Sequence, residues 1–413
     1  MRRPARLVVL ITHPVQYFKP VFAALAAEAD LELLVLFGCD HGVRSSLDPD
    51  FGVEFAWDSA PTEGFPHAFL SKRPLPDLSR WGVALPLALE AVRRVRSFRP
   101  DGVLVFAYSP AFITLTTLLL AATGQHLLLR ADGTDRAFPR SALKSASKDG
   151  LLRAYYTLLR HVFPIGSDSD DHFRRLGVPA SRRTPVPYAI DVDYFAAQVE
   201  RWLPRREQLR AQENLPPERV VLLWAGKITA VKNPGLLVEA LALLPEAVRL
   251  RLALVVVGDG PLRQEFERRL EPLLPGRCRF AGFRNQSEMG RFHALADALV
   301  FPSRQGETWG LVVNEALQFG LPVLVSDHAG CARDLVAPDA HPPAGSAVFP
   351  SGNPRALAAA LERLLEQHDP TRLRQPMEPL PHPGDLARAV ATVVRGLVPA
   401  QAASHSASTT QRQ

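Results

Sequence analysis

The stretch FPSRQGETWGLVVNEALQFGLPVLVSDHAG occupies residues 301–330 and decides how the rest of the chain is interpreted. Its pattern predicts a buried strand that ends near Ser303, a loop that carries Glu307, and a helix that opens at Trp309–Gly310. A second short strand is predicted at 322–326. A strand, loop, helix and strand in this order are typical of an α/β domain with a parallel sheet.

The start of this helix is a predicted anion-binding site. The backbone N–H groups of Gly310, Leu311 and Val312 have no partner within the helix and point out of the carboxyl edge of the sheet. Glu307 stands just before these donors, and Glu315 lies in the second turn of the helix. Either glutamate alone is explained as a dipole partner or a solvated residue. Their spacing around the N–H groups favours a ligand site.

The stretch LLWAGKITAVKNP at 222–234 predicts a second strand, loop and helix of the same kind, with Pro234 at the helix start. Its loop carries Lys227 and Lys232, two of only six lysines in an arginine-rich chain. Compact ammonium groups suit point contacts to phosphate oxygens. The alternative is that both are surface lysines beside a loop.

The first half of the chain alternates predicted strands and helices, which implies βαβ units. In the segment SDSDDHFRRLG, Ser167 or Asp168 is a candidate helix N-cap and Gly177 a candidate stop. The predicted strands are 7–12, 31–37, 102–106, 126–130 and 163–166, and the predicted helices are 21–29, 85–98, 111–122 and 151–162.

Residues 196–219 are charged and interrupted by prolines, so we place a domain joint near Asp191–Phe195. The alternation then restarts, which predicts an α/β protein with two Rossmann-like domains facing a central cleft. The expected domains are 1–195 and 196–375, followed by a helix within 376–400 that packs back toward the first domain and a disordered tail at 401–413. The predicted strands of the second domain are 220–225, 250–257, 279–281, 298–301, 322–326 and 347–349, and its helices are 234–244, 262–273, 287–296, 311–319 and 354–367, with a helical turn at 331–336 and a last helix at 386–397.

Composition excludes several classes of protein. The 413 residues are 47% apolar and 22% charged, which is typical of globular domains, and three separated cysteines exclude a disulfide framework and fit a reducing cytosol. The opening apolar run is interrupted too early for a signal peptide, and the longest run, 111–122, is too short to span a bilayer. The net charge of +6 reflects either arginine-rich codon usage or a cationic face for phosphates or anionic lipid. No basic run with interleaved aromatics indicates nucleic-acid binding.

Four segments in chain order resemble the C-terminal domain of family 4 retaining glycosyltransferases, the group 1 glycosyl transferases with the GT-B fold. They are GKITAVKNP (226–234), VVVGDGPLRQEFE (255–267), FAGFRNQSEMGRFHALADALVFPS (280–303) and ETWGLVVNEALQFGLPVLVSDHAG (307–330). The opening LITHPVQYFKPVFAAL (10–25) and the segment at 48–70 are similar to the acceptor domain of one bacterial branch of that family.

The resemblance implies a role for each matching residue. Lys227, where the family usually has arginine, and Lys232 would neutralise the donor diphosphate. Glu307 would hold hydroxyls of the donor sugar, and Glu315 the nucleotide ribose. These two lysines and Glu307 form the expected catalytic set. The expected donor-binding set also includes the segment around the base and the amides that cap the β-phosphate: Gly226, Gly258, Asp259, Phe283, Arg284, Thr308, Trp309, Gly310, Leu311 and Val312.

The acceptor side departs from the family pattern. Many relatives have a glycine-rich loop after the first strand, where this chain has His13 and Gln16 in HPVQY. His13 either contacts the acceptor or diphosphate, or caps the strand end. Many relatives also place a histidine at the end of a strand near the sugar, and here Arg130 or Asp132 is the candidate substitute.

The resemblance implies a hexosyltransferase that needs neither metal nor cofactor beyond a nucleotide sugar such as a UDP- or GDP-hexose. A nucleoside diphosphate leaves readily once its charge is neutralised, which fits that expectation. Two DxD motifs, at 168–170 and 191–193, resemble metal-binding sequences, but the first sits at a helix start and the second at the domain joint. The glycines at 258–260 lack the third glycine of a dinucleotide-binding site. The expected acceptor is a carbohydrate, a lipid-linked or a small molecule in polysaccharide, glycolipid or natural-product assembly. The expected location is the cytoplasm, with peripheral membrane contact left open. A nucleotide-sugar epimerase and a non-catalytic binding subunit are the alternatives.

Overall fold

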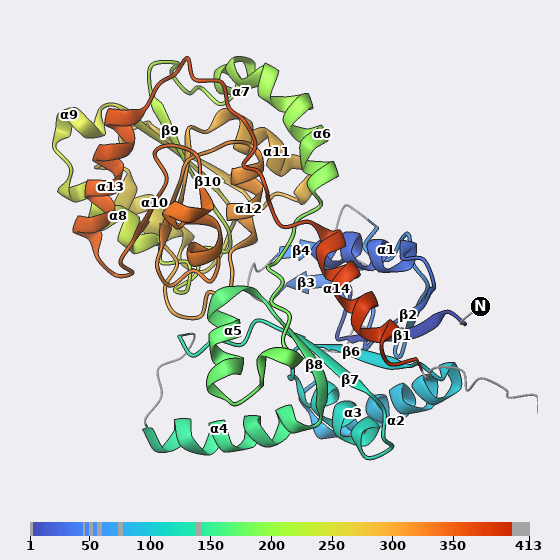
Figure 1. Ribbon diagram of the computed structural model, residues 1–413. Helices are drawn as coiled ribbons and strands as arrows, with labels where there is room; N and C mark the ends of the chain where they lie inside the picture. The colour runs from blue at the N-terminus through green and yellow to red at the C-terminus, as the bar shows by residue number, and fades with distance from the viewer. Residues whose placement is uncertain are drawn as a thin grey trace, which may run out of the picture.

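The computed structural model describes residues 3–43, 46–48, 53–55, 60–72, 77–136 and 142–398, of which 46–48, 53–55 and 142–145 are described by backbone alone. The predicted tail at 401–413 lies outside these residues, and so do residues 49–52 and 56–59 of the segment 48–70. Figure 1 shows two α/β lobes, an N-terminal one coloured blue to green and a C-terminal one coloured yellow to orange.

The N-terminal lobe is built on a parallel sheet with the strand order β5-β2-β1-β6-β7-β8. Its central strands are continuous apolar runs because helices cover both faces. The strands are β1 (Ala5–Ile11), β2 (Leu31–Phe37), β5 (His67–Phe69), β6 (Gly102–Phe106), β7 (Leu127–Ala131) and β8 (Leu159–Pro164), and a separate antiparallel pair is formed by β3 (Ser46–Asp48) and β4 (Val53–Phe55).

Helices from both ends of the chain cover this sheet. One face packs against α2, α3, α4 and α5, and the other face packs against α1 and the final helix α14. Arg395 at the end of α14 forms an ion pair with Glu28 at 2.9 Å. The helices are α1 (Lys19–Ala27), α2 (Trp81–Phe98), α3 (Ala111–Ala121), α4 (Ala142–Thr157), α5 (Gly166–Arg175) and α14 (Pro383–Arg395).

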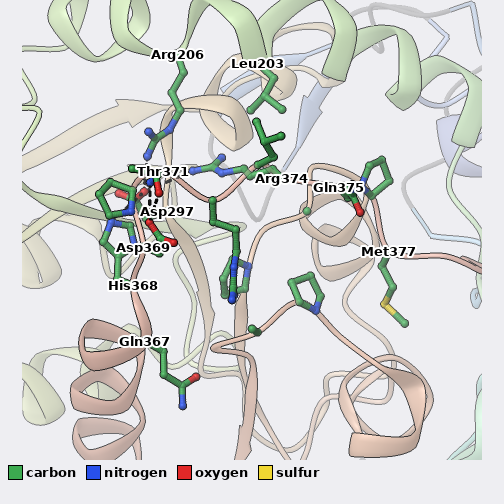
Figure 2. A pocket seen from close by; sticks show the side chains of 18 of the residues that line it. Leu203, Arg206, Asp297, Gln367, His368, Asp369, Thr371, Arg374, Gln375 and Met377 are labelled. Atoms are coloured by element: carbon green, nitrogen blue, oxygen red, sulfur yellow. Dashed lines mark hydrogen bonds and ion pairs between the residues drawn. The ribbon is translucent and has the colours of Figure 1, made fainter.

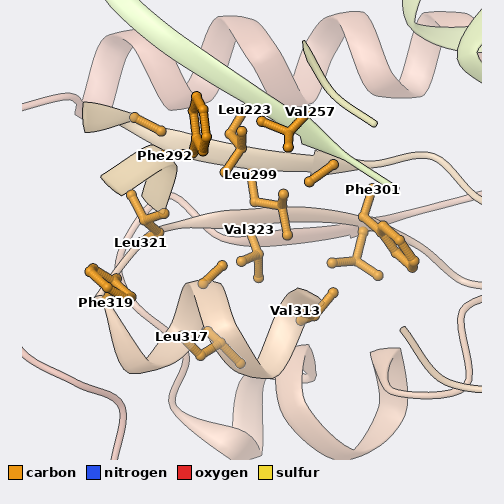
Figure 3. Packing of buried hydrophobic residues seen from close by; sticks show 14 of the residues in the cluster. Leu223, Val257, Phe292, Leu299, Phe301, Val313, Leu317, Phe319, Leu321 and Val323 are labelled. Atoms are coloured by element: carbon orange, nitrogen blue, oxygen red, sulfur yellow. The ribbon is translucent and has the colours of Figure 1, made fainter. Parts of the chain in front are cut away.

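The C-terminal lobe repeats the plan, with the parallel order β11-β10-β9-β12-β13-β14. Figure 3 shows one apolar layer, where Leu223, Leu299 and Val323 of neighbouring strands pack against Val313 and Leu317. The strands are β9 (Val220–Ala225), β10 (Leu252–Val257), β11 (Cys278–Gly282), β12 (Ala298–Phe301), β13 (Val323–Ser326) and β14 (Ala347–Phe349).

The helices of this lobe also lie on both faces. The layer of Figure 3 is covered by α6 (Val192–Trp202), α7 (Arg206–Gln212), α11 (Gln286–Leu295) and α12 (Leu311–Gln318). The other face is covered by α8 (Pro234–Leu243), α10 (Arg263–Leu270) and α13 (Pro354–Gln367), with the short α9 (Glu246–Arg249) at its margin.

Each sheet has one topological switch point. The strand order runs outward in one direction from β1 and β9, and the chain then returns to start the opposite direction at β6 and β12. Ligands of doubly wound sheets bind beyond the carboxyl ends of the strands at such points. The predicted pair of Rossmann-like domains is confirmed by these two sheets.

Three local predictions differ from the structure. The predicted helix 151–162 is wrong at its end, because 159–164 pairs with β7 as strand β8. The charged segment 196–219, for which no helix was predicted, contains most of α6 and all of α7, and the predicted boundary at 195, which stays a prediction, falls inside α6. Neither Ser167 nor Asp168 caps α5. The helix begins at Gly166, and Asp334 of the other lobe accepts hydrogen bonds from the Ser167 N–H at 3.0 and 3.1 Å.

No helix in the described part of the chain is both long enough and apolar enough to cross a bilayer.

Candidate active site

Two glycine turns that approach each other closely lie at the carboxyl end of the C-terminal sheet. Gly226 follows β9 and Gly258 follows β10, with φ of +145° and +135°. A Cβ at Gly258 would lie 1.9 Å from the carbonyl oxygen of Gly226, so only glycine fits there. These turns open a cavity of about 170 Å³. Its walls include the predicted donor residues Gly226, Gly258, Phe283, Arg284, Val312 and Glu315, together with Gln16 and Tyr17 of the N-terminal lobe.

The predicted catalytic residues Lys232 and Glu307 touch each other. The Lys232 ammonium forms an ion pair with Oε2 of Glu307, and Ser303 Oγ donates to the same oxygen at 3.1 Å. Lys232 Nζ also lies 4.7 Å from the centroid of the Phe301 ring. Both charged groups are largely buried, with side-chain exposures of 22% for Lys232 and 11% for Glu307. The loop therefore holds a desolvated cation and anion next to each other. Lys227 lies partly exposed directly after Gly226.

Helix α12 begins at Leu311 without a side-chain cap. Its N-cap is Gly310, with φ of +107°, and a Cβ there would lie 2.5 Å from Cε1 of Phe301. Trp309 just before it is buried, and its indole N–H donates to Asn314 at 2.9 Å. The uncapped start of α12, beside Lys232, is therefore a site suited to an anion.

Glu315 is buried, with 2% of its surface exposed. Its Oε1 accepts a hydrogen bond from the Tyr17 hydroxyl at 2.8 Å, and its Oε2 lies 3.1 Å from Nε2 of His293. The alternative that Glu315 is a solvated helix residue is therefore wrong. Sequence reasoning missed both partners of this carboxylate.

The predicted acceptor residues do not form one cluster. His13 lies with its ring 5.4 Å from that of His41, and burial together with His41 lowers the pKa of His13 to about 4. Gln16 lines the donor cavity instead of a separate acceptor surface. Asp132 lies partly exposed after β7 and raises the pKa of Tyr188 by its charge, a smaller effect than burial.

Arg130 is buried and bound to backbone. Its guanidinium donates to the carbonyl oxygens of Val186, Pro164 at 3.3 Å and Pro187 at 3.0 Å. Burial lowers its pKa to about 10. Its hydrogen bonds thus fasten the segment after α5 to the sheet, and a role of Arg130 on the acceptor side stays a prediction.

The remaining predicted donor residues are placed around the same sheet edge. Asp259 is occupied within its own turn, with Oδ1 accepting from the Gly260 N–H at 2.8 Å and Oδ2 paired with Arg263 at 2.5 Å. Thr308 packs by its backbone against Gly330, where a Cβ would lie 1.9 Å from the Thr308 carbonyl oxygen.

A larger cavity, of about 680 Å³, lies at the amino end of the C-terminal sheet (Figure 2). Asp297, directly before β12, is paired there with Arg206, Arg210 and Arg374. Arg374 also donates to carbonyl oxygens at the end of α11, including that of Ala294 at 3.2 Å. Because helix C-termini attract cations, these charges are explained by capping and by Asp297 itself. The candidate active site is therefore the one at the carboxyl end of the sheet.

Two facing Rossmann-like domains with a cavity between them define the GT-B fold. Within this chain, residues 205–377 match the model of a family described as Glycosyl transferases group 1. The chain is 32% identical to a D-inositol 3-phosphate glycosyltransferase of Xylanimonas cellulosilytica over 181 residues, which cover 42% of this chain and 41% of that protein. The chain spans about two to three fifths of the curated relatives it matches first.

Solved structures resemble the whole chain. Anabaena Alr3699/HepE, in complex with UDP and glucose, aligns with a TM-score of 0.60 at 17% identity, covering 95% of this chain and 96% of that one. A UDP-GlcNAc 2-epimerase from Neisseria meningitidis aligns with a TM-score of 0.59 at 13% identity, covering 95% and 99%. At these identities the likeness establishes the fold alone.

Proposed function

We propose that this protein is a retaining glycosyltransferase of family 4, which moves a hexose from a nucleotide-diphosphate sugar to an acceptor hydroxyl without a metal ion. The observation that carries the proposal is the buried Lys232–Glu307 pair beside the uncapped start of α12, at the carboxyl edge of the C-terminal sheet. The family match over 205–377 covers all of these residues.

The nucleotide-sugar donor would bind at the carboxyl edge of the C-terminal sheet, with its negatively charged diphosphate facing positively charged groups. Lys227, Lys232 and the first N–H groups of α12 would neutralise the diphosphate, and they act strongly because the site is partly desolvated. Glu307 would then accept hydroxyls of the hexose in place of the lysine contact, and Glu315 would accept ribose hydroxyls. The base would lie along Phe283 and Arg284, which line the cavity. A UDP- or GDP-hexose is the donor class that we propose.

The reaction breaks the bond between the anomeric carbon and the diphosphate oxygen. The electron pair leaves with the diphosphate, and the acceptor oxygen bonds to the anomeric carbon from the same face. The acceptor proton passes to the departing phosphate oxygen. This route retains the anomeric configuration. It requires the protein to neutralise the charge of the leaving group, and it does not require a separate general base.

The acceptor that we propose is a carbohydrate, lipid-linked or small molecule in polysaccharide, glycolipid or natural-product assembly. The Xylanimonas relative is a D-inositol 3-phosphate glycosyltransferase, which supports a hydroxylated, polar acceptor. We further propose that the protein acts in the cytoplasm, with peripheral contact to the inner face of the membrane where the acceptor is lipid-linked.

An epimerase is the second candidate, because the Neisseria epimerase shares the fold over 95% of this chain. The two reactions differ in their products. Transfer consumes an acceptor and releases a nucleoside diphosphate, whereas epimerisation returns a nucleotide sugar of altered sugar configuration. A non-catalytic subunit would bind the nucleotide sugar and change nothing.

The test is an assay of nucleoside diphosphate release from UDP- and GDP-hexoses, with the sugar product analysed by NMR. We expect release that increases with acceptor and falls at least about 100-fold in Glu307→Gln, since the neutral amide no longer pairs with Lys232 or accepts sugar hydroxyls as strongly. Glu267→Gln, at an exposed position of the same lobe, is the matched control and should retain activity. Epimerised sugar nucleotide, or equal turnover in Glu307→Gln, would refute the proposal.

A further inference from the structure

The N-terminal lobe sends one turn into the donor cavity. Gln16 and Tyr17 lie on the 3-10 turn Gln16–Phe18, a few residues beyond the end of β1, and both line the cavity beside Gly226 and Glu315. We name this turn the η1 turn. His13 lies three residues before this turn in the chain.

The carboxylate of Glu315 is shared between the lobes. The Tyr17 hydroxyl donates to Oε1 at 2.8 Å, while His293 approaches Oε2 at 3.1 Å from within the C-terminal lobe. Burial, and next the charge of Glu315, raise the pKa of Tyr17 well above its ordinary value, so the phenol stays a neutral donor at any ordinary pH. Each oxygen therefore already has one donor.

This arrangement conflicts with the proposed role of Glu315 as the ribose ligand. Only 2% of Glu315 is exposed, and the oxygen that His293 leaves free is the one that Tyr17 takes. A carboxylate oxygen can accept two hydrogen bonds, but Glu315 is so buried that a ribose hydroxyl reaches Oε1 only where the phenol gives it room. Nucleotide binding and the Tyr17–Glu315 contact therefore compete.

Gln16 provides the second observation. Gln16 is buried, with 6% of its surface exposed, and its Oε1 accepts no hydrogen bond from any described residue. A buried amide oxygen without a donor carries a desolvation penalty that a partner removes. In the wall of this cavity, a ligand O–H or N–H is the partner that fits.

We propose that the η1 turn gates the nucleotide pocket: Tyr17 holds Glu315 until a ribose hydroxyl replaces it, and Gln16 then accepts a hydrogen bond from the bound nucleoside. The inference rests on the proposed function and assigns regulation to the same site. Because linkage is reciprocal, a bound nucleotide releases the Tyr17 phenol from Glu315, just as loss of this contact strengthens nucleotide binding.

The test is isothermal titration of UDP and GDP into the full chain and into Tyr17→Phe, Gln16→Ala and Tyr188→Phe. Tyr17→Phe should bind about tenfold more tightly, which is about 1.4 kcal/mol, because it removes the competitor. Gln16→Ala should bind about tenfold more weakly, because it removes a ligand contact. Tyr188→Phe is the control, since Tyr188 lies at the same lobe interface, 6.0 Å from the Trp309 ring, and makes no bond to Glu315 in the described structure.

Hydrogen exchange on Gln16→Ala gives an independent readout, because this variant lacks the contact by which a bound nucleoside would hold the η1 turn. Saturating UDP or GDP should speed exchange of the backbone amides of Phe18 and its neighbours in this variant, while slowing exchange around Gly310. Nucleotide binding to the wild type with equal or weaker binding by Tyr17→Phe would overturn the gate and leave the proposed function standing, as would slower exchange in the η1 turn. Absence of binding by any UDP or GDP ligand would overturn both.

Discussion

His13 is a titratable residue placed where its neutral form is strongly favoured. Burial and the neighbouring His41 lower its pKa from 6.5 to about 4. Between these values the unfolded chain binds a proton that the folded protein does not, so stability rises with pH across this window and is lost as the pH falls.

The expected loss on going from pH 7 to pH 5 is about 2 kcal/mol from this residue alone. Urea unfolding of the wild type and of His13→Asn at both pH values measures it, because the variant lacks the titrating group and should lose that much less stability. His126→Asn, at an exposed position, should keep the wild-type pH dependence. Equal pH dependence in His13→Asn and the wild type would contradict the assignment.

Residues of the candidate site could be predicted where a local sequence pattern marks their position. Glu307, Lys232 and Gly310 stand at fixed distances from strand and helix ends, and those ends can be recognised from the apolar pattern. Tyr17 meets Glu315 across 298 positions, and His293 meets it from another helix. No spacing rule reports such contacts, so only the folded arrangement reveals that the second glutamate is shared.

The loop before α12 shows how an element start depends on one glycine. Gly310 has φ of +107°, and a Cβ at this position would lie 2.5 and 2.8 Å from ring atoms of Phe301. We expect Gly310→Ala to lower the free energy of unfolding by about 2–5 kcal/mol, from backbone strain and from overpacking against the buried ring. Nucleotide binding should weaken too, because the helix start would move.

A matched variant separates the two causes. Gly276 also has a positive φ, of +66°, but a Cβ there meets no atom within 4 Å. Gly276→Ala should therefore show backbone strain alone, about 1–2 kcal/mol. Urea unfolding of both variants measures their free energies of unfolding. A Gly310→Ala protein as stable as Gly276→Ala would show that the Phe301 ring moves aside without loss of stability.

Elements with strong apolar runs were predicted with their observed bounds. The segments 102–106, 220–225 and 298–301 are buried throughout, and 31–37 is buried except at Glu32 and Leu34, so their apolar composition marks them as strands. Helices α6 and α7 were missed because their sequence is charged and interrupted by proline, and they are fixed mainly by the lobe they cover. Short edge strands such as β5 carry too few residues for a pattern.

At the scale of the whole molecule, the lobes complete each other's elements. Asp334 reaches from the C-terminal lobe to the start of α5 and accepts hydrogen bonds from the Ser167 N–H and from its hydroxyl, the latter at 2.8 Å. A carboxylate at a helix N-terminus satisfies free N–H groups and faces the positive end of the dipole. The cap of an N-terminal helix is thus supplied by the other lobe.

Removal of this carboxylate should loosen α5 without touching the donor loop. In Asp334→Ala we expect the first-turn amides of α5 to exchange with solvent about fivefold faster, which corresponds to the ~1 kcal/mol of a lost helix cap. Asp327→Ala is the control, because Asp327 accepts from the Ser351 N–H at 2.8 Å inside the C-terminal lobe and should leave α5 unchanged. Since Asp334 acts through Ser167, the double variant with Ser167→Ala should add less than the sum of the single effects. Unchanged exchange in α5 of Asp334→Ala would mean that the lobes meet in solution without this cap.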